Sequence, residues 1–174
     1  VAFKHGFKGR IEGNFKKVSA SDVSNIIQRC GTILKSARFD EFRTEEGRAK
    51  AAAILKDEGI KSLIVIGGDG SFQGGTLLAN EHDISVIGVP ATIDNDLVGS
   101  DETIGYDTAL NTAMDAIDKI RDTADAHDRL FLVEVMGRDA GFIALETGIA
   151  GGAELILLPE SMTNIDEVRS NLNN

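Results

Sequence analysis

The sequence predicts an α/β protein with an open, mostly parallel sheet and helices on both faces. Short apolar runs alternate with helical segments along the chain, the order produced by parallel strands joined through helical crossovers. Three polar loops, GGDGS, PATIDND and MGRD, each begin directly after such a run. The composition, 42% apolar and 26% charged residues, is that of an ordinary globular chain. A compact sheet protein with ligand loops at one sheet edge is therefore expected.

The first half of the chain shows the pattern of one strand between two helices. A helix is predicted over residues 44–59, where Thr44 can cap the start and Gly59 suits the end. Residues 62–66, SLIVI, predict a strand buried on both faces. A second helix is predicted across residues 72–80, directly after a glycine-rich turn.

The same alternation continues to the end of the chain. Strands are predicted at 84–89, 130–135 and 154–158, and helices at about 106–124 and 142–149. Each strand is followed by a loop and a helix, so parallel pairing is expected throughout.

Composition excludes several classes of protein. A net charge of −10 argues against a nucleic-acid surface, since phosphate backbones are bound by lysine and arginine clusters. No apolar run approaches the roughly 20 residues that cross a bilayer, and the start does not resemble a signal peptide, so a cytoplasmic location is expected. Cys30 is the single cysteine, which leaves no intrachain disulfide and no cysteine-based zinc site.

The glycine-rich segment 67–71, GGDGS, is the first candidate ligand loop. Glycines let backbone N–H groups approach phosphate oxygens, and the following helix offers its positive end. Asp69 is a candidate magnesium ligand, because magnesium bridges carboxylate and phosphate oxygens. The alternative is a tight strand-to-helix turn that requires glycine for positive φ.

The second candidate loop is 92–96, TIDND. In an extended segment Asp94 and Asp96 share a face, where mutual repulsion and a nearby cation decide which carboxylate accepts a proton. The alternative is an Asx-rich turn with no chemical role. Because this loop follows the strand after the one that ends in GGDGS, both loops are expected at one sheet edge.

Four arginines near the predicted element ends are candidate phosphate ligands, since guanidinium groups bind phosphate through two parallel hydrogen bonds. A solvated surface arginine is the alternative for each. They are Arg38, Arg43, Arg129 and Arg138.

Six segments together resemble the bacterial-type ATP-dependent 6-phosphofructokinase family. In order along the chain they are SARFDEFR, GGDGS, PATIDND, TIGYDTA, VEVMGRDAG and AGGAELILLPE. The resemblance covers nearly the whole chain and corresponds to about the N-terminal half of a family member. It implies a glycolytic kinase that moves the γ-phosphoryl group of ATP to the 1-hydroxyl of fructose 6-phosphate, giving fructose 1,6-bisphosphate and ADP.

The resemblance also implies an incomplete phosphofructokinase fold. Residues 1–105 would form the nucleotide-binding lobe without its first strand and loop, and residues 106–174 the start of the sugar-phosphate lobe. The chain by itself is accordingly expected to be inactive.

Carried over position by position, the resemblance implies three catalytic residues: Asp94 as general base, Thr92 beside the transferring phosphoryl group, and Arg138. The implied sugar-binding residues are Thr92, Ile93, Asp94, Asp96, Arg129, Met136, Gly137 and Arg138. The implied nucleotide contacts are Arg38, Phe39, Gly68, Asp69, Gly70 and Ser71, with Mg²⁺ on Asp69. Arg129 resembles an arginine that reaches a neighbouring subunit, which implies a homo-oligomer and, by family resemblance, a homotetramer.

The phosphoryl donor depends on two positions. Pyrophosphate-dependent relatives typically carry aspartate where Gly70 stands and lysine where Ala91 stands, so glycine and alanine here favour ATP. A pyrophosphate-dependent enzyme, a GGDG-loop kinase acting on NAD or lipid, and a non-catalytic nucleotide-binding regulatory module are the alternatives. The TIDND and MGR segments disfavour the second, and the joint presence of Asp69, Asp94 and Arg138 disfavours the third.

Three further residues match the family's effector site, where a nucleoside diphosphate such as ADP activates and phosphoenolpyruvate inhibits. They are Arg121, Gly152 and Glu154. Allosteric control is therefore an expectation of the resemblance.

Overall fold

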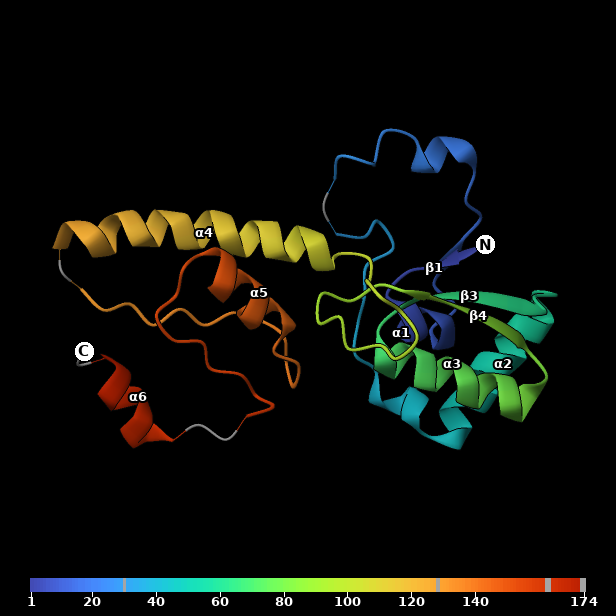
Figure 1. Ribbon diagram of the computed structural model, residues 1–174. Helices are drawn as coiled ribbons and strands as arrows, with labels where there is room; N and C mark the ends of the chain where they lie inside the picture. The colour runs from blue at the N-terminus through green and yellow to red at the C-terminus, as the bar shows by residue number, and fades with distance from the viewer. Residues whose placement is uncertain (30, 128, 162–163, 173–174) are drawn as a thin grey trace. The chain divides into compact units, whose positions relative to one another are not determined.

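Figure 1 shows the computed structural model of the chain, and Cys30 lies outside its described residues. Those residues are 1–29, 31–127, 129–161 and 164–172. None of the helices within these ranges is both long and apolar enough to cross a membrane.

The chain divides into two compact units. Unit 1 consists of Val1–Val65 and Gly70–Gly88, and unit 2 of Ile66–Asp69 and Val89–Asn174. The lobes expected at 1–105 and 106–174 are functional assignments and stay a prediction, because the compact units reflect packing alone.

Unit 1 opens with a small antiparallel hairpin and short helical turns. Ala2 pairs with Lys16 and Phe3 with Phe15 across the hairpin. Its short elements are β1 (Ala2–Phe3), α1 (Gly6–Ile11), β2 (Phe15–Lys16) and the 3₁₀ turns η1 (Ala20–Val23) and η2 (Asp40–Arg43).

Helix α2 (Glu45–Asp57) confirms the predicted helix and its signals. The Thr44 side chain accepts a hydrogen bond from the Gly47 amide at 3.1 Å, which satisfies one of the free N–H groups of the first turn. Gly59 adopts a φ of 68°, the left-handed conformation that ends a helix. Local sequence therefore sets both ends of α2.

Strands β3 (Ser62–Gly67) and β4 (Ser85–Pro90) form a two-stranded sheet joined through α3 (Asp69–His82). The Ser85 amide donates to the Lys61 carbonyl at 3.1 Å, and the Ala91 amide donates to the Gly67 carbonyl at 3.0 Å. Both bonds join residues the same number of positions apart in the same direction, so the strands run parallel. The predicted α/β class with parallel pairing is confirmed.

The prediction that β3 is buried on both faces is wrong. Leu63 and Val65 are buried against the helices, whereas Ile64 and Ile66 are 68% and 64% exposed. Ile87 on β4 is equally open, at 66%. An apolar run of this kind suits a strand with both faces buried, but in the described chain helices pack against only one face of β3.

The core of unit 1 lies between β3, α2 and α3. Leu55 and Leu78 are fully buried, and the Phe42 ring stacks on Phe7 with centroids 3.8 Å apart. The buried cluster comprises Phe42, Ala51, Ala52, Leu55, Leu63, Val65, Leu78 and Ile84. Because Phe42 belongs to η2, this core also fixes the segment that carries Arg38 and Phe39.

A charged pair joins α2 to α3 beside this core. Arg48 Nε and Nη2 each donate to the Glu81 carboxylate at 2.7 Å, and Nη1 donates to the Arg43 carbonyl at 2.7 Å. Hydrogen bonding to Arg48 holds the pKa of Glu81 below its ordinary value. The pair therefore stabilises the fold above the unfolded-state pKa of glutamate, about 4.3, and the stabilisation is lost as pH falls through the lower folded-state pKa.

We expect the melting temperature of the chain to fall as the pH is lowered below about 4, and Glu81→Gln to flatten that part of the profile. Thermal unfolding followed by circular dichroism between neutral and acid pH measures both. Asp115→Asn, which removes a pair with Lys119 whose side chains are about 70% exposed, is the matched control and should leave the profile unchanged. An unaltered acid slope in Glu81→Gln would contradict the assignment.

Unit 2 contains α4 (Tyr106–His127), α5 (Phe142–Ala150) and α6 (Ile165–Leu172). Helices α4 and α5 lie side by side (Figure 1), and Arg121 Nη1 on α4 donates to the Gly151 carbonyl at the end of α5. Both helices were expected from the sequence.

The strands predicted at 130–135 and 154–158 do not form, and both described segments have no regular secondary structure. A strand exists only through hydrogen bonds to a neighbour, and neither apolar run has a described strand to pair with. The two apolar runs therefore have the composition of strands but no strand hydrogen bonds in the described chain.

Candidate functional site

The turn between β3 and α3 forms the first part of the candidate site. Helix α3 begins at Asp69, three residues before the predicted start, so Asp69, Gly70 and Ser71 form its first turn. The first N–H groups of a helix lack intrahelical partners, and together with the helix dipole they favour anions. The geometry suits a phosphate group at this end of α3.

Close approach, rather than backbone conformation, accounts for Gly68. None of Gly67, Gly68 and Gly70 has a positive φ, so the alternative of a turn that requires glycine conformation is wrong. A Cβ on Gly68 would lie 3.3 Å from the Thr92 Cβ, so glycine lets the GGDGS and TIDND loops touch. The two loops therefore meet at the carboxyl ends of β3 and β4, as expected from parallel pairing.

Gly70 has open space around it. A Cβ built at Gly70 would meet no atom within 4 Å, and its φ is not positive. Nothing in the described chain requires glycine at this position, which leaves the approach of a ligand to the first turn of α3 as a reason for it.

Residues 92–96, here called the Asx loop, carry the candidate carboxylates. Thr92 and Asp94 are half-buried, whereas Asp96 is exposed. The Asp94 amide donates to Thr92 Oγ1 at 3.2 Å, so the Asp94 backbone is held within the loop. An open depression of about 400 Å³ beside the loop is lined by residues 95–101 and Phe142.

Asn95 and Thr103 were missed by the sequence reasoning as contributors to this site. Asn95 has a φ of 52°, a left-handed conformation that asparagine tolerates. Its Oδ1 accepts from the Thr103 amide at 2.9 Å, and its Nδ2 donates to the Asp101 carbonyl at 3.2 Å. The Asx loop is thus also a structural turn, and the central asparagine between two aspartates was the available signal.

Tyr106 anchors the segment that follows, where α4 begins. Its side chain is buried and meets the Phe142 ring edge-on, with centroids 6.5 Å apart. Burial raises the pKa of Tyr106 to about 12, so its hydroxyl stays neutral at physiological pH.

Magnesium fits the chemistry of this edge only together with a nucleotide. Within the described ranges, no group of three or more His, Cys, Asp or Glu residues could hold a metal ion. Magnesium in phosphoryl-transfer sites commonly takes one or two carboxylates and completes its shell with phosphate oxygens and water. Asp69, exposed in the first turn of α3, suits such a shared shell.

Gly137 and Arg138, which follow Met136, begin a tight turn before α5 that is closed by a hydrogen bond from the Ala140 amide to the Gly137 carbonyl at 3.0 Å. Gly137 has a φ of 153°, and a Cβ there would lie 2.4 Å from the Ala140 carbonyl oxygen, so only glycine fits. Arg138 adopts a φ of 58°, a left-handed conformation that costs a non-glycine residue about 1–2 kcal/mol. Strain of this kind is often found at functional positions.

The Arg138 side chain is 72% exposed, with Nε 3.7 Å from the Asp139 carboxylate. Among described residues, no hydrogen bond or ion pair joins Met136, Gly137 or Arg138 to the Asx loop. Arg129 is exposed as well. The sugar-binding roles of Met136, Gly137, Arg138 and Arg129 stay a prediction. The same holds for Ile93 in the Asx loop.

The predicted nucleotide contacts Arg38 and Phe39 belong to unit 1. Phe39 packs against the core cluster and directly precedes η2, while Arg38 is exposed. Arg43 lies 3.5 Å from Asp40 in an exposed pair. Arg43 was not assigned to the nucleotide, whereas the nucleotide contacts of Arg38 and Phe39 stay a prediction.

Two of the three predicted effector residues come together. Arg121 donates to the Gly151 carbonyl, and a Cβ on Gly152 would lie 2.8 Å from Arg121 Nη1. Glu154 is exposed two residues further along the chain.

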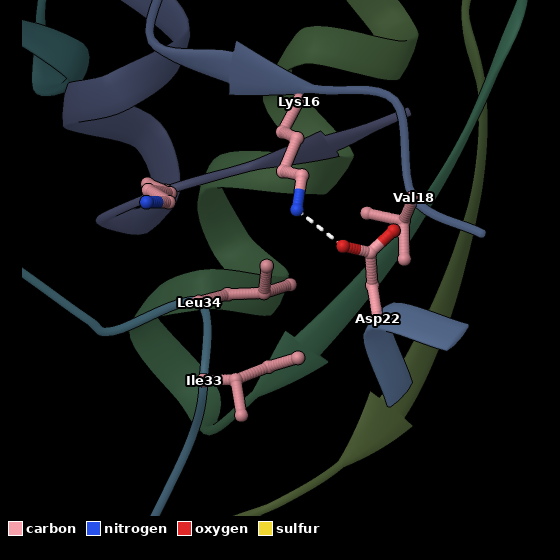
Figure 2. Close-up of a pocket in the computed structure, with 6 residues that line it drawn as sticks. Lys16, Val18, Asp22, Ile33 and Leu34 are labelled. Atoms are coloured by element: carbon pink, nitrogen blue, oxygen red, sulfur yellow. Dashed lines mark hydrogen bonds and ion pairs between the residues drawn. The ribbon is translucent and has the colours of Figure 1, made fainter. Parts of the chain in front are cut away.

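A separate cavity of about 200 Å³ lies in unit 1 (Figure 2). Lys16 and Asp22 form an ion pair at this cavity, with Val18 beside Asp22, and the aliphatic side chains of Ile33 and Leu34 lie on the opposite side. Hydrogen bonds from Lys16 and Ser19 hold the pKa of Asp22 well below its ordinary value. None of the predicted site residues lines this cavity.

The fold and the two touching loops define the chain as an α/β protein with a ligand site at the carboxyl ends of parallel strands. The family model described as phosphofructokinase matches residues 1–174, the whole chain. The chain belongs to the phosphofructokinase family.

Individual relatives agree with this assignment. The "ATP-dependent 6-phosphofructokinase 1" of Thermus thermophilus is 59% identical over 160 residues, which cover 92% of this chain and 50% of that protein. The "ATP-dependent 6-phosphofructokinase 2" of Bacteroides thetaiotaomicron is 57% identical over 169 residues, covering 97% of this chain and 52% of that protein. The chain thus spans about half the length of these relatives.

A solved structure confirms the fold. Phosphofructokinase from Saccharomyces cerevisiae superposes with a TM-score of 0.89 at 36% identity, covering 99% of this chain and 27% of that chain. The predicted incomplete phosphofructokinase fold is therefore confirmed.

Proposed function

We propose that the full-length protein containing this chain is an ATP-dependent 6-phosphofructokinase, with fructose 6-phosphate and ATP as substrates. The observation that carries the proposal is the contact between Gly68 and Thr92, because it brings a phosphate-binding helix start beside a carboxylate loop. The identity to relatives named for this activity supports the same reaction.

In the proposed mechanism Asp94 accepts the proton of the sugar 1-hydroxyl as its oxygen attacks the γ-phosphorus of ATP. The Thr92 hydroxyl lies beside the transferring group, and the first N–H groups of α3 bind phosphate oxygens. Arg138 neutralises charge that develops on the phosphoryl oxygens. Magnesium on Asp69, when bound with ATP, supplies further charge neutralisation.

Two positions favour ATP over pyrophosphate as the donor. Gly70 leaves open space within 4 Å, room that a nucleotide needs and an aspartate would remove. Ala91, whose amide donates to the Gly67 carbonyl, carries no cation for pyrophosphate. The same proposal includes the binding of fructose 6-phosphate. The residues that bind it are 92–94, Asp96, Arg129 and 136–138.

The remaining assignments complete the proposal. Arg38, Phe39, Gly68, Gly70 and Ser71 contact the nucleotide, and a second subunit receives Arg129 in a homotetramer. An effector such as ADP or phosphoenolpyruvate binds near Arg121, and the enzyme acts in the cytoplasm.

The proposal is tested by the phosphorylation of fructose 6-phosphate by the full-length protein, with ATP and pyrophosphate supplied in parallel. Turnover with ATP supports it. Turnover with pyrophosphate alone would reassign the donor, and turnover with neither would favour the regulatory-module alternative.

We expect Gly70→Asp to raise the KM for ATP by about 100-fold or more, because like charges brought together at a binding surface cost several kcal/mol. Steady-state kinetics with varied ATP measure this effect. Gly70→Ala is the control for added bulk without charge and should raise KM less. An unchanged KM in Gly70→Asp would remove Gly70 from the nucleotide site.

A further inference from the structure

The segment after the Asx loop is held against it by hydrogen bonds from one buried threonine. Residues 100–105, here called the strap, lie between the Asx loop and α4 and directly precede α4. Thr103 is 5% exposed although it lies in the middle of a polar segment. A buried hydroxyl in a loop is stable only if it is hydrogen-bonded, so its partners indicate what it does.

The hydroxyl and the amide of Thr103 are directed at the Asx loop, while its carbonyl accepts from the Tyr106 amide at 3.1 Å. Its Oγ1 donates to the Thr92 carbonyl oxygen at 2.6 Å, and its amide donates to Asn95 Oδ1 at 2.9 Å. The two acceptors lie on either side of Asp94 in the sequence. Thr103 thus fixes the backbone of Thr92, before Asp94, and the side chain of Asn95, after it.

The strap is itself held in place by hydrogen bonds and packing, so it can act as a fixed support for the Asx loop. The Ile104 amide donates to the Pro90 carbonyl at the end of β4 at 2.9 Å. Asn95 Nδ2 donates to the Asp101 carbonyl at 3.2 Å, closing the loop and the strap into one hydrogen-bonded ring. Burial of Tyr106 anchors the far end.

We propose that Thr103 is a positioning residue for phosphoryl transfer: through Thr92 and Asn95 it sets the placement of the Asp94 carboxylate. The inference rests on the proposed function, since it assigns a part in that reaction to a buried residue that acts through Thr92 and Asn95. Misplacement of a reacting group by about 1 Å lowers the rate by as much as ~10²-fold. The loss is expected in kcat, because substrate-binding groups elsewhere are unchanged.

Thr103→Val removes the hydroxyl with little change in volume, and Thr103→Ser keeps it. Thr147→Val is the matched control: Thr147 is 2% exposed, and its Oγ1 donates to the Ile143 carbonyl at 2.6 Å within α5 and not to the Asx loop. Amide hydrogen exchange is measured on the chain itself. Thr103→Val should speed exchange at Asp94 and at residue 103 by about tenfold, the effect of losing one buried hydrogen bond.

The second readout is steady-state kinetics of the full-length protein. Thr103→Val should lower kcat by about 10- to 100-fold with the KM for both substrates unchanged, while Thr103→Ser and Thr147→Val stay near the wild type. Unchanged exchange in Thr103→Val overturns the proposal, as do equal losses in Thr103→Val and Thr147→Val. If the wild type itself shows no turnover, the proposed function fails, and the exchange result alone decides whether Thr103 fixes the loop.

Discussion

Asp94→Asn is expected to lower the kcat of the full-length protein by about 10²- to 10⁴-fold while both substrates still bind. An amide has the same size as a carboxylate but does not accept a proton from the sugar hydroxyl. The bond from the Asp94 amide to Thr92 Oγ1 uses only the backbone at this residue, so the loop should persist. Steady-state rates, with calorimetric binding of each substrate, measure the separate effects.

Asp96→Asn is the informative comparison, because the second carboxylate of the Asx loop is exposed whereas Asp94 is half-buried. We expect it to retain more activity than Asp94→Asn. If Asp96→Asn lost more, the general base would be Asp96. A wild-type kcat in Asp94→Asn would exclude it from proton transfer.

Gly47→Ala is expected to destabilise the chain by about 3 kcal/mol, the upper part of the range for overpacked sites. A Cβ on Gly47 would lie 2.0 Å from the carbonyl oxygen of Glu41, which is backbone of η2. Glycine to alanine within a helix ordinarily stabilises by about 0.5–1 kcal/mol, so the sign here is reversed by packing. Urea unfolding of the purified chain measures the free energy of unfolding.

The control is Gly70→Ala, at a helical position where a Cβ meets nothing within 4 Å. It should leave stability unchanged or raise it by up to about 1 kcal/mol. Equal effects of the two substitutions would show that η2 moves away from α2 at little cost. A shift of η2 would also displace Arg38 and Phe39, so nucleotide binding by Gly47→Ala in the full-length protein is a second readout.

The sequence predicted those elements whose signals are local. Helix α2 is specified by its own residues, from the Thr44 cap to the left-handed Gly59. Strands β3 and β4 were recoverable because their β-branched runs are short and each ends at a marked loop. Parallel pairing then placed the GGDGS and Asx loops together, which the Gly68 to Thr92 approach bears out.

Features that depend on distant partners were not predictable in this way. The runs 130–135 and 154–158 have the composition of strands, but composition does not specify which strand would pair with them. Neither run forms strand hydrogen bonds in the described chain. The contact of Thr103 with Thr92 and Asn95 depends on the left-handed backbone of Asn95, which one sequence does not specify. The chemical roles of Asp69, Asp94 and Arg138 stay predictions for the kinetic tests above.

The division of the chain has a consequence for protein engineering. The backbone passes into unit 2 at Ile66, returns to unit 1 after Asp69 and enters unit 2 again at Val89. A single proteolytic cut therefore does not separate the two units, because even a cut after Gly88 leaves Ile66–Asp69 of unit 2 on the fragment that holds unit 1. A chimaera that exchanged one unit between relatives would need junctions after Val65, Asp69 and Gly88. The middle junction falls inside the first turn of α3, so the candidate phosphate-binding turn is inherited from both parents.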